Sequence, residues 1–229
     1  MSRGYKPIIE LKNVEKVYNP GQENEVRALK GINMKVYRKD FLAVVGPSGC
    51  GKTTLLNMLG CLDRPTKGQV LIDGKDTSKL SDEELARIRR DKIGFIFQDF
   101  NLIPTLTALE NVELAMRLDG IKRAEAKEKA KAFLRLVGLG KRINHFPNQL
   151  SGGEAQRVAI ARAIVKQPEV ILADEPTGNL DTNTGQEIVE LMKELNAKNF
   201  TFVIVTHDLS MADFADKRVR IKDGKIMEG

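Results

Sequence analysis

Short runs of apolar residues recur along the chain, and each is followed by a polar or glycine-rich segment. Such continuous runs are typical of strands that are buried on both faces of a parallel sheet. They cover residues 41–45 (FLAVV), 93–97 (IGFIF), 170–172 (VIL) and 201–205 (TFVIV). Residues 8–14 instead alternate apolar and polar side chains, and residues 26–37 also have strand character. The pattern predicts an α/β fold with a mainly parallel sheet and a small antiparallel sheet beside it.

Helices are predicted between the first three of these runs, and three of the helices begin with a capping box. Each box pairs an N-cap with a glutamate three residues later: Ser81 with Glu84, Thr107 with Glu110, and Ser151 with Glu154. Residues 126–137 carry apolar side chains at helical spacing, and residues 218–228 predict a hairpin. We expect one domain over residues 1–229. Its α/β core covers 1–98 and 160–229, including the antiparallel part, and a helical subdomain covers 99–159.

Residues 46–53, GPSGCGKT, fit the phosphate-loop pattern G-x-x-x-x-G-K-[ST] between a predicted strand and a predicted helix. In such a loop the backbone N–H groups surround phosphates, the lysine (Lys52) reaches the β and γ oxygens, and the hydroxyl of Thr53 ligates Mg²⁺. The alternative interpretation is an ordinary glycine turn before a helix. The flanking strand and helix, together with acids farther along the chain, disfavour it.

Those acids are Asp174 and Glu175, which follow the buried run 170–172. They are predicted at the carboxyl end of a parallel strand, the edge where open α/β sheets bind ligands. Two adjacent carboxylates are hard to keep ionised there unless a cation lies beside one of them, and Mg²⁺ is the natural candidate. The loop and the acids together predict one nucleotide-hydrolysing site.

Composition narrows the classes of partner. The chain has 37 Lys and Arg against 31 Asp and Glu, a net charge of +6. Because the basic residues are interspersed with acids and no nucleic-acid motif occurs, we expect no nucleic-acid partner. Cys50 and Cys61 lack paired metal spacing and favour a reducing cytosol. No apolar run approaches the roughly 18 residues of a membrane span, so we expect any membrane role to come through a partner.

A further helix start contains more glycine than a cap requires. Ser151 is the expected N-cap, and Gly152 and Gly153 follow it in the segment LSGGEAQRVAIARAIV. Glycines weaken a helix and expose its N–H groups, and exposed N–H groups at a helix start suit an anion. The simpler interpretation is a helix start and nothing more. The residues alone leave open whose phosphate it would meet.

With Gln98, the motif NLD at 179–181 and His207 added in order, the chain resembles the nucleotide-binding subunit of ABC transporters over nearly its whole length. Residues 60–74 and 89–116 resemble the lipoprotein-releasing and macrolide-export subgroup. The resemblance implies the P-loop ATPase fold and the hydrolysis of ATP coupled to transport.

The resemblance also implies a second copy of the chain as partner. Two subunits would close head to tail, with each ATP between the phosphate loop of one chain and residues 151–153 of the other. The nucleotide-contacting residues that it implies are Tyr18, Gly46, Pro47, Ser48, Gly49, Cys50, Gly51, Lys52, Thr53, Thr54, Ser151, Gly152, Gly153 and Asp181. Tyr18 would stack on adenine, although packing at a sheet edge would also explain a single aromatic residue near a turn.

Catalytic roles follow from the same resemblance. Glu175 would be the general base or the carboxylate that polarises water, and His207 would fix the γ-phosphate beside Lys52. Gln98 would approach both Mg²⁺ and the attacking water. The implied metal ligands are Thr53, Gln98 and Asp174. A histidine after a buried strand is otherwise more often a core residue than a catalytic one.

The segment from Gln98 to Leu106 is expected to contact a separate integral-membrane permease, since its residues 100–106 (FNLIPTL) are unusually apolar for a loop. The protein would then be cytoplasmic and peripheral on the inner face of the membrane.

Two positions depart from the family pattern. Glu154 and Ala155 stand where glutamines are frequent in the family. Because Glu154 still completes the capping box, we expect little harm, although a carboxylate near a partner's phosphates would oppose closure. Cys50 lies inside the phosphate loop, which predicts that its alkylation blocks hydrolysis and that ATP protects it.

The main alternative is an ABC-type ATPase of a signalling or cell-division complex that moves no substrate. A chromosome-type ATPase would need a long coiled coil before residue 150, and a ribosome-type protein would need two cassettes. A GTP-binding switch or a small-molecule kinase would leave the segment at Ser151 without a purpose. The sequence does not specify the transported substrate.

Overall fold

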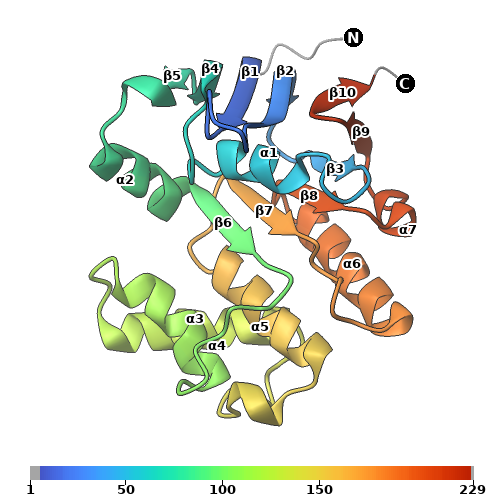
Figure 1. Cartoon of the computed structure of the whole chain (residues 1–229). Helices are drawn as coiled ribbons and strands as arrows, with labels where there is room; N and C mark the ends of the chain where they lie inside the picture. The colour runs from blue at the N-terminus through green and yellow to red at the C-terminus, as the bar shows by residue number, and fades with distance from the viewer. Residues whose placement is uncertain (1–5, 228–229) are drawn as a thin grey trace.

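The computed structural model describes residues 6–227, so residue 228 of the predicted hairpin lies outside the described part. The chain forms two sheets (Figure 1). The first, antiparallel, has the order β2-β1-β4-β5, with β1 (Ile9–Tyr18), β2 (Val26–Val36), β4 (Lys67–Ile72) and β5 (Lys75–Asp76). The second has the order β10-β9-β3-β8-β7-β6, with β3 (Phe41–Val45), β6 (Ile93–Ile96), β7 (Val170–Asp174), β8 (Phe202–Thr206), β9 (Lys217–Lys222) and β10 (Lys225–Met227).

The second sheet is parallel except at its edge, where β10 runs antiparallel to β9. This arrangement confirms the predicted combination of a mainly parallel sheet with an antiparallel one. Its register places Val45 beside Thr206, and Asp174 beside Val205. The carboxyl ends of β3, β7 and β8 therefore meet at one edge, where the phosphate loop, the two acids and His207 follow the strands.

The helices are α1 (Lys52–Leu59), α2 (Asp82–Lys92), α3 (Ala108–Arg117), α4 (Arg123–Leu136), α5 (Gly152–Ile164), α6 (Thr182–Ala197) and α7 (Leu209–Ala212), with short 3-10 turns at Thr77–Lys79 and Pro147–Gln149. The three predicted capping boxes are present at the starts of α2, α3 and α5. Within residues 6–227 no helix combines the length and the apolar character needed to cross a membrane.

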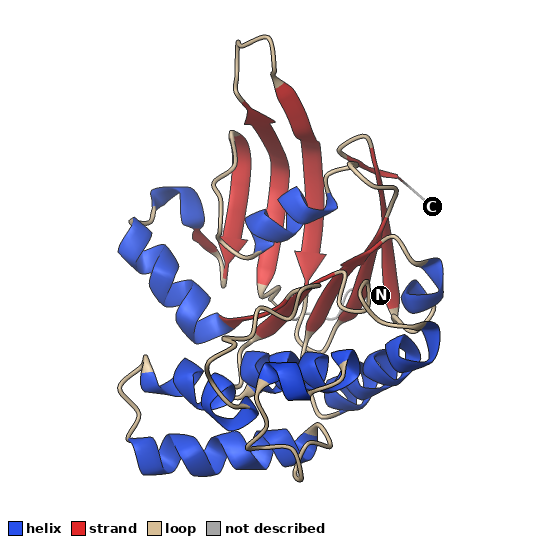
Figure 2. Ribbon diagram, turned by 60° about the horizontal axis from the view of Figure 1, so that its bottom comes forward, coloured by secondary structure: helices blue, strands red, loops and turns tan. Residues whose placement is uncertain are grey.

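The parallel sheet is covered on both faces, as Figure 2 shows. Side chains alternate along its strands: Phe41 and Phe202 pack with α3, α4, α5 and α6, whereas Leu42 and Val203 pack with α1 and the antiparallel sheet. This alternation explains why the strands are continuous apolar runs, since both of their faces are buried. It also fixes α1 between the two sheets, directly behind the phosphate loop.

The predicted subdomain boundary after residue 159 falls inside α5, which is one continuous helix. This helix packs against α3 and α4 and also against β6 and α6. The helical part is therefore joined to the sheet through a shared helix, and a sharp division at residue 159 does not describe the fold.

Candidate nucleotide-binding site

Close backbone contacts determine the shape of the loop between β3 and α1. Gly51 has φ +105°, and a Cβ atom there would lie 2.5 Å from the carbonyl oxygen of Ala28. A Cβ atom on Gly46 would lie 2.3 Å from the carbonyl oxygen of Ile221. Glycine is therefore required at both positions by the neighbouring backbone. The N-cap Gly51 also leaves the first N–H groups of α1 without a side-chain acceptor.

Lys52 folds back over this loop. Its Nζ donates to the carbonyl oxygens of Gly46 at 2.9 Å and Pro47 at 3.1 Å, and lies 4.0 Å from Oε1 of Glu175. The residue is only 7% exposed. A buried ammonium held mainly by carbonyl dipoles favours an anion beside it, because its charge is only partly compensated.

Asp174 lies at the end of β7, and burial raises the pKa of its carboxyl group. The adjacent Glu175 raises this pKa further, while a hydrogen bond from the Thr53 hydroxyl and the charge of Lys52 partly offset the rise. A divalent cation beside Asp174 would stabilise its ionised form. Carboxylate and hydroxyl oxygens are ligands that Mg²⁺ prefers, so Asp174 and Thr53 fit this ion.

No group of three or more His, Cys, Asp or Glu residues in the described part of the chain could hold a metal by itself.

Glu175 has a left-handed backbone, with φ +44°, which is rare for a residue with a side chain. Its N–H donates to the carbonyl of Val205, and its Oε1 lies 2.9 Å from Nδ1 of His207. The backbone N–H of His207 donates to Oε2 of Glu175 at 3.3 Å. Both carboxylate oxygens are therefore oriented by the residue after β8. Strained backbone of this kind is concentrated at functional sites.

A cavity of about 740 Å³ lies at this sheet edge. The predicted site residues that line it are Tyr18, Ser48, Gly49, Gly51, Lys52, Thr53, Thr54, Gln98, Asp174, Glu175 and His207. Gly46 and Pro47 are not part of this lining, but their carbonyl oxygens accept hydrogen bonds from Lys52. The structure therefore brings together the phosphate loop, the two acids, the glutamine and the histidine.

Cys50 is absent from the residues that line the cavity, so its predicted nucleotide contact would have to come from its backbone. Its side chain is 3% exposed and belongs to the apolar cluster between α1 and the antiparallel sheet. A loop position alone does not tell which way a side chain points. Because the thiol is enclosed in the core, rapid alkylation of the folded protein is no longer expected.

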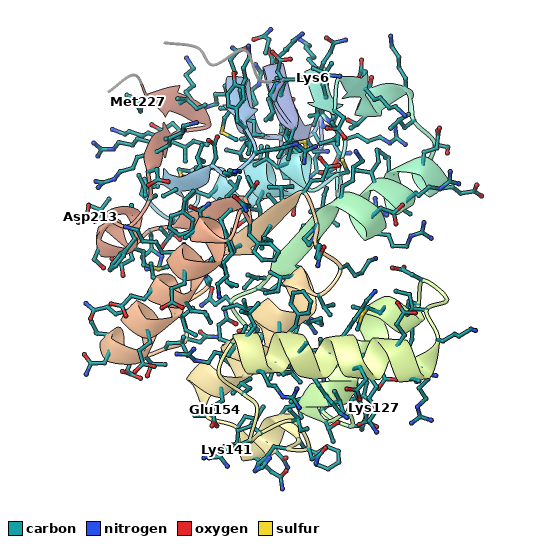
Figure 3. The ribbon with its side chains drawn as sticks, turned by 180° about the vertical axis from the view of Figure 1, so that it is seen from behind. Lys6, Lys127, Lys141, Glu154, Asp213 and Met227 are labelled. Carbon is teal, nitrogen blue, oxygen red and sulfur yellow. The ribbon has the colours of Figure 1, made fainter. Side chains whose placement is uncertain are left out.

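Residues 151–153 and Asp181 also lie outside this cavity. Gly153 is buried, and a Cβ atom there would lie 2.5 Å from Cγ2 of Thr184, so this glycine allows close packing of α5 on α6. Asp181 caps α6 by accepting from the N–H of Thr184 at 3.1 Å. Figure 3 shows Glu154 on the helical side of the molecule, and its carboxylate pairs with Arg142 at 2.9 Å.

Asn179 was not predicted to be a site residue, although it holds Gln98 in place. The side-chain amide of Gln98 donates to Oδ1 of Asn179 at 3.0 Å, and Asn179 donates to the backbone carbonyl of Gln98 and to Asp99. The only available signal was its place in the NLD motif. The hairpin of β9 and β10 was predicted, but its contact with the site was not: its tip residue Gly224 lines the cavity, and the N–H of Gly224 donates to the carbonyl of Cys50 behind the loop.

Comparisons with known proteins agree with this geometry. The family model described as ABC transporter matches residues 29–178. An uncharacterized ABC transporter ATP-binding protein of Thermotoga maritima is 55% identical over 221 residues, which are 96% of this chain and 94% of that protein. The macrolide export ATP-binding/permease protein MacB of Hyphomonas neptunium is 48% identical over 96% of this chain, but the match spans only 34% of MacB.

Two similar solved structures are of MJ0796, a protein of Methanocaldococcus jannaschii. The dimeric structure of this bacterial ABC transporter cassette has a TM-score of 0.87 and 49% identity, and the match covers 96% of this chain and 97% of that one. A dimeric post-hydrolysis state bound to ADP and Pi has a TM-score of 0.86. The chain therefore belongs to the ABC transporter family, as an ATP-binding cassette that hydrolyses ATP.

Proposed function

We propose that two copies of this cassette close head to tail and hydrolyse ATP between them, one chain supplying residues 46–54 and the other residues 151–153. The main support for this proposal is that every predicted catalytic residue lines one cavity, whereas the start of α5 lies outside it. Each chain alone would then contain an incomplete ATP site. The solved dimers of MJ0796 support the proposal, since that cassette is similar over nearly its whole length.

In this site Thr53, Asp174 and Gln98 would hold Mg²⁺, which when bound neutralises charge on the phosphoryl group. The raised pKa of Asp174 supports its part, because a buried carboxyl group gains most from a neighbouring cation. The glutamine is kept at the cavity by Asn179. Lys52 and the N–H groups of α1 would bind the phosphates.

Glu175 would accept a proton from the attacking water or polarise it. With its ring proton on Nδ1, His207 donates to Oε1 of Glu175 and holds the carboxylate toward the cavity. His207 lines the same cavity and is the group we assign to the γ-phosphate. General-base assistance of this kind contributes roughly 10² to 10⁴ in rate. Tyr18, at the end of β1, would stack on the base.

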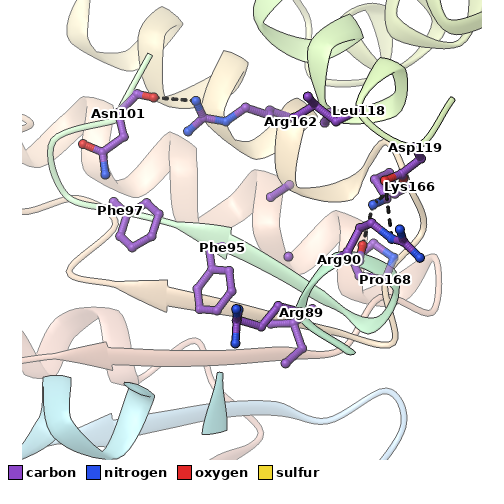
Figure 4. Close-up of a pocket in the computed structure, with 14 residues that line it drawn as sticks. Arg89, Arg90, Phe95, Phe97, Asn101, Leu118, Asp119, Arg162, Lys166 and Pro168 are labelled. Atoms are coloured by element: carbon purple, nitrogen blue, oxygen red, sulfur yellow. Dashed lines mark hydrogen bonds and ion pairs between the residues drawn. The ribbon is translucent and has the colours of Figure 1, made fainter. Parts of the chain in front are cut away.

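We further propose that the cassette is a peripheral subunit on the inner face of a membrane and drives a permease. A second cavity, of about 520 Å³, lies between β6, α2, α3 and α5 (Figure 4). Phe95, Phe97 and the 76% exposed Leu118 give it an apolar lining beside Asn101. In the segment from Gln98 to Leu106, which was expected to contact the permease, Leu102 packs partly into the helical core and Ile103 is 39% exposed.

A short helix of the permease would occupy this second cavity. We propose macrolide or peptide export or lipoprotein release as its role, and of these the resemblance to MacB supports macrolide export. Changing Leu118 to Asp should abolish co-purification with the permease. Leu136→Asp, at a position on α4 outside this cavity, should leave it intact. Equal recovery of the permease with both variants would contradict the assignment.

The test of the shared ATP site uses Glu175→Gln, which should bind ATP without cleaving it. At saturating ATP this variant should elute from gel filtration as a dimer. The double variant Glu175→Gln, Ser151→Arg should remain monomeric, because the added side chain blocks the helix start. Glu190→Gln, an exposed acid on α6, is the matched control for the loss of a carboxylate. A monomeric Glu175→Gln with ATP binding confirmed would refute the shared site.

A further inference from the structure

Tyr18 is held from two sides by residues that have not been assigned a role. Its hydroxyl donates to Oδ2 of Asp63 at 3.2 Å. Nζ of Lys16 donates to Oδ1 of the same carboxylate at 2.6 Å and lies 4.9 Å from the centroid of the Tyr18 ring. The side chains of Lys16 and Asp63 are 12% and 31% exposed. One carboxylate and one ammonium thus fix both the tip and the body of a single ring.

The carboxylate is well anchored. Oδ1 of Asp63 also accepts from the backbone N–H of Arg64 at 2.7 Å. Burial alone would raise the pKa of Asp63, but the hydrogen bond from Lys16 and that from the Arg64 N–H outweigh it, so the pKa is lowered. The group is therefore ionised at neutral pH. Lys16 additionally donates to the carbonyl of Arg64 at 3.0 Å.

Asp63 is carried by the turn that ends α1, the helix that starts in the phosphate loop. The N–H groups of Gly60 and Leu62 donate to Leu56 and Asn57 of the helix. Nη1 of Arg89 donates to the carbonyl of Cys61 at 2.8 Å, which ties this turn to α2. One short helix therefore begins in the phosphate loop and leads into the turn whose Asp63 accepts from the Tyr18 hydroxyl.

Lys16 lies outside the cavity in which the nucleotide would bind. Tyr18 lines the nucleotide cavity, whereas Lys16 and Asp63 do not. Tyr18 itself is half-buried, so part of its side chain remains accessible at the cavity, while the two residues that hold it lie outside the cavity lining. An aromatic side chain whose rotation is already restricted loses less entropy when a base stacks on it.

We propose that Asp63 and Lys16 are positioning residues that hold the Tyr18 ring at a fixed distance from the phosphate loop and so strengthen binding of the nucleoside part of ATP. This inference rests on the proposed stacking of the base on Tyr18. Neither residue touches the nucleotide, and both act through the ring.

The test compares ATP with inorganic tripolyphosphate, which has phosphates but no base, by calorimetric titration of the full chain with Mg²⁺. Asp63→Asn should weaken ATP binding about threefold to tenfold, which is the size of a typical net hydrogen-bond contribution. Its affinity for tripolyphosphate should not change. Lys16→Met should weaken ATP binding about twofold to fivefold, and Lys16→Arg, which keeps the cation, should restore it.

Tyr18→Phe keeps the ring and the fold but loses the hydroxyl, so it carries the test if Asp63→Asn does not fold. It should weaken ATP binding like Asp63→Asn, and the double variant should be no weaker than either single variant. Equal weakening of ATP and tripolyphosphate would show a merely structural role and overturn the proposal. Unchanged ATP affinity in Asp63→Asn and Tyr18→Phe would overturn it as well.

Tyr18→Ala separates this inference from the proposed function. If Tyr18→Ala weakens ATP binding while Asp63→Asn does not, the stacking stands and the positioning role falls. If Tyr18→Ala leaves ATP affinity unchanged, the stacking itself is wrong and the positioning role falls with it.

Discussion

The chain has two glycine-rich helix starts, and they differ in how their own N–H groups are satisfied. At the start of α1 the N-cap Gly51 offers no side-chain acceptor, and the first turn carries no acid. At the start of α5 the hydroxyl of Ser151 accepts from the N–H of Glu154, and the carboxylate of Glu154 accepts from the N–H of Ser151. The first start is open to an anion, and the second is already capped.

This difference explains why one chain would hold ATP but not complete its site. The N–H groups of α1 and the ammonium of Lys52 converge on one loop, so phosphates can bind there without a partner. At α5 an anion meets the charge of Glu154, whose pKa is lowered first by the N–H of Ser151 and then by Arg142. Closure of a dimer must supply the free energy for this second contact.

Removing the proposed catalytic carboxylate, while both helix starts stay unchanged, should have the largest effect on activity. Glu175→Gln should lower kcat about 10² to 10⁴-fold, since the carboxylate that accepts the proton is lost, and should leave ATP affinity nearly unchanged. Phosphate release and equilibrium titration measure the two quantities. Glu190→Gln should match the native rate. A Glu175→Gln protein that turns over at the native rate would mean that the base lies elsewhere.

Replacing a glycine by alanine at the start of α1 and at the start of α5 should show how differently the two helix starts tolerate a side chain. Gly51→Ala places Cβ 2.5 Å from a backbone carbonyl at φ +105°, so it should cost about 1–3 kcal/mol of folding free energy and weaken ATP binding. Gly152→Ala places Cβ 3.0 Å from the flexible end of Leu180 and should change stability by less than about 1 kcal/mol. Denaturant unfolding checks both, and equal costs would remove the distinction.

The acid beside the α1 start should show a pH dependence. Because folding raises the pKa of Asp174, mainly through burial, the folded chain binds more protons than the unfolded chain, and stability falls as pH rises from about 3.8 through the folded value. Asp174→Asn cannot ionise. It should melt higher than the native protein at pH 7 without nucleotide or Mg²⁺, and this advantage should shrink toward pH 4. An Asn variant that melts lower at pH 7 would contradict the assignment.

The smallest effect is expected at the α5 start. Glu154→Gln keeps the capping box but loses the charge and the ion pair with Arg142, so stability should change by less than about 0.5 kcal/mol. In the Glu175→Gln background it should strengthen the ATP-dependent dimer about threefold at most. Sedimentation equilibrium measures this change, and a weaker dimer would show that Glu154 assists closure.

Local rules predicted much of the fold and part of the site. The capping boxes at Ser81, Thr107 and Ser151 depend on neighbours three residues apart, so sequence spacing defines them. The meeting of Gly46, Asp174 and His207 follows from the rule that parallel strands share a carboxyl edge.

Other features depended on contacts that a single sequence does not reveal. Helix α6 was not predicted, because Thr184 and Gly185 weaken its first turns and packing against the sheet stabilises it instead. The burial of Cys50 depends on which way one loop side chain points. The bond between Gln98 and Asn179 joins residues 81 positions apart.

A shared hydrolytic site requires that each chain contain only part of it. The most direct test is the ATPase rate per chain, measured over a wide range of protein concentration while sedimentation follows the oligomeric state. The rate per chain should rise with protein concentration and level off once dimers form. A constant rate per chain, persisting at dilutions where only monomers are present, would contradict it.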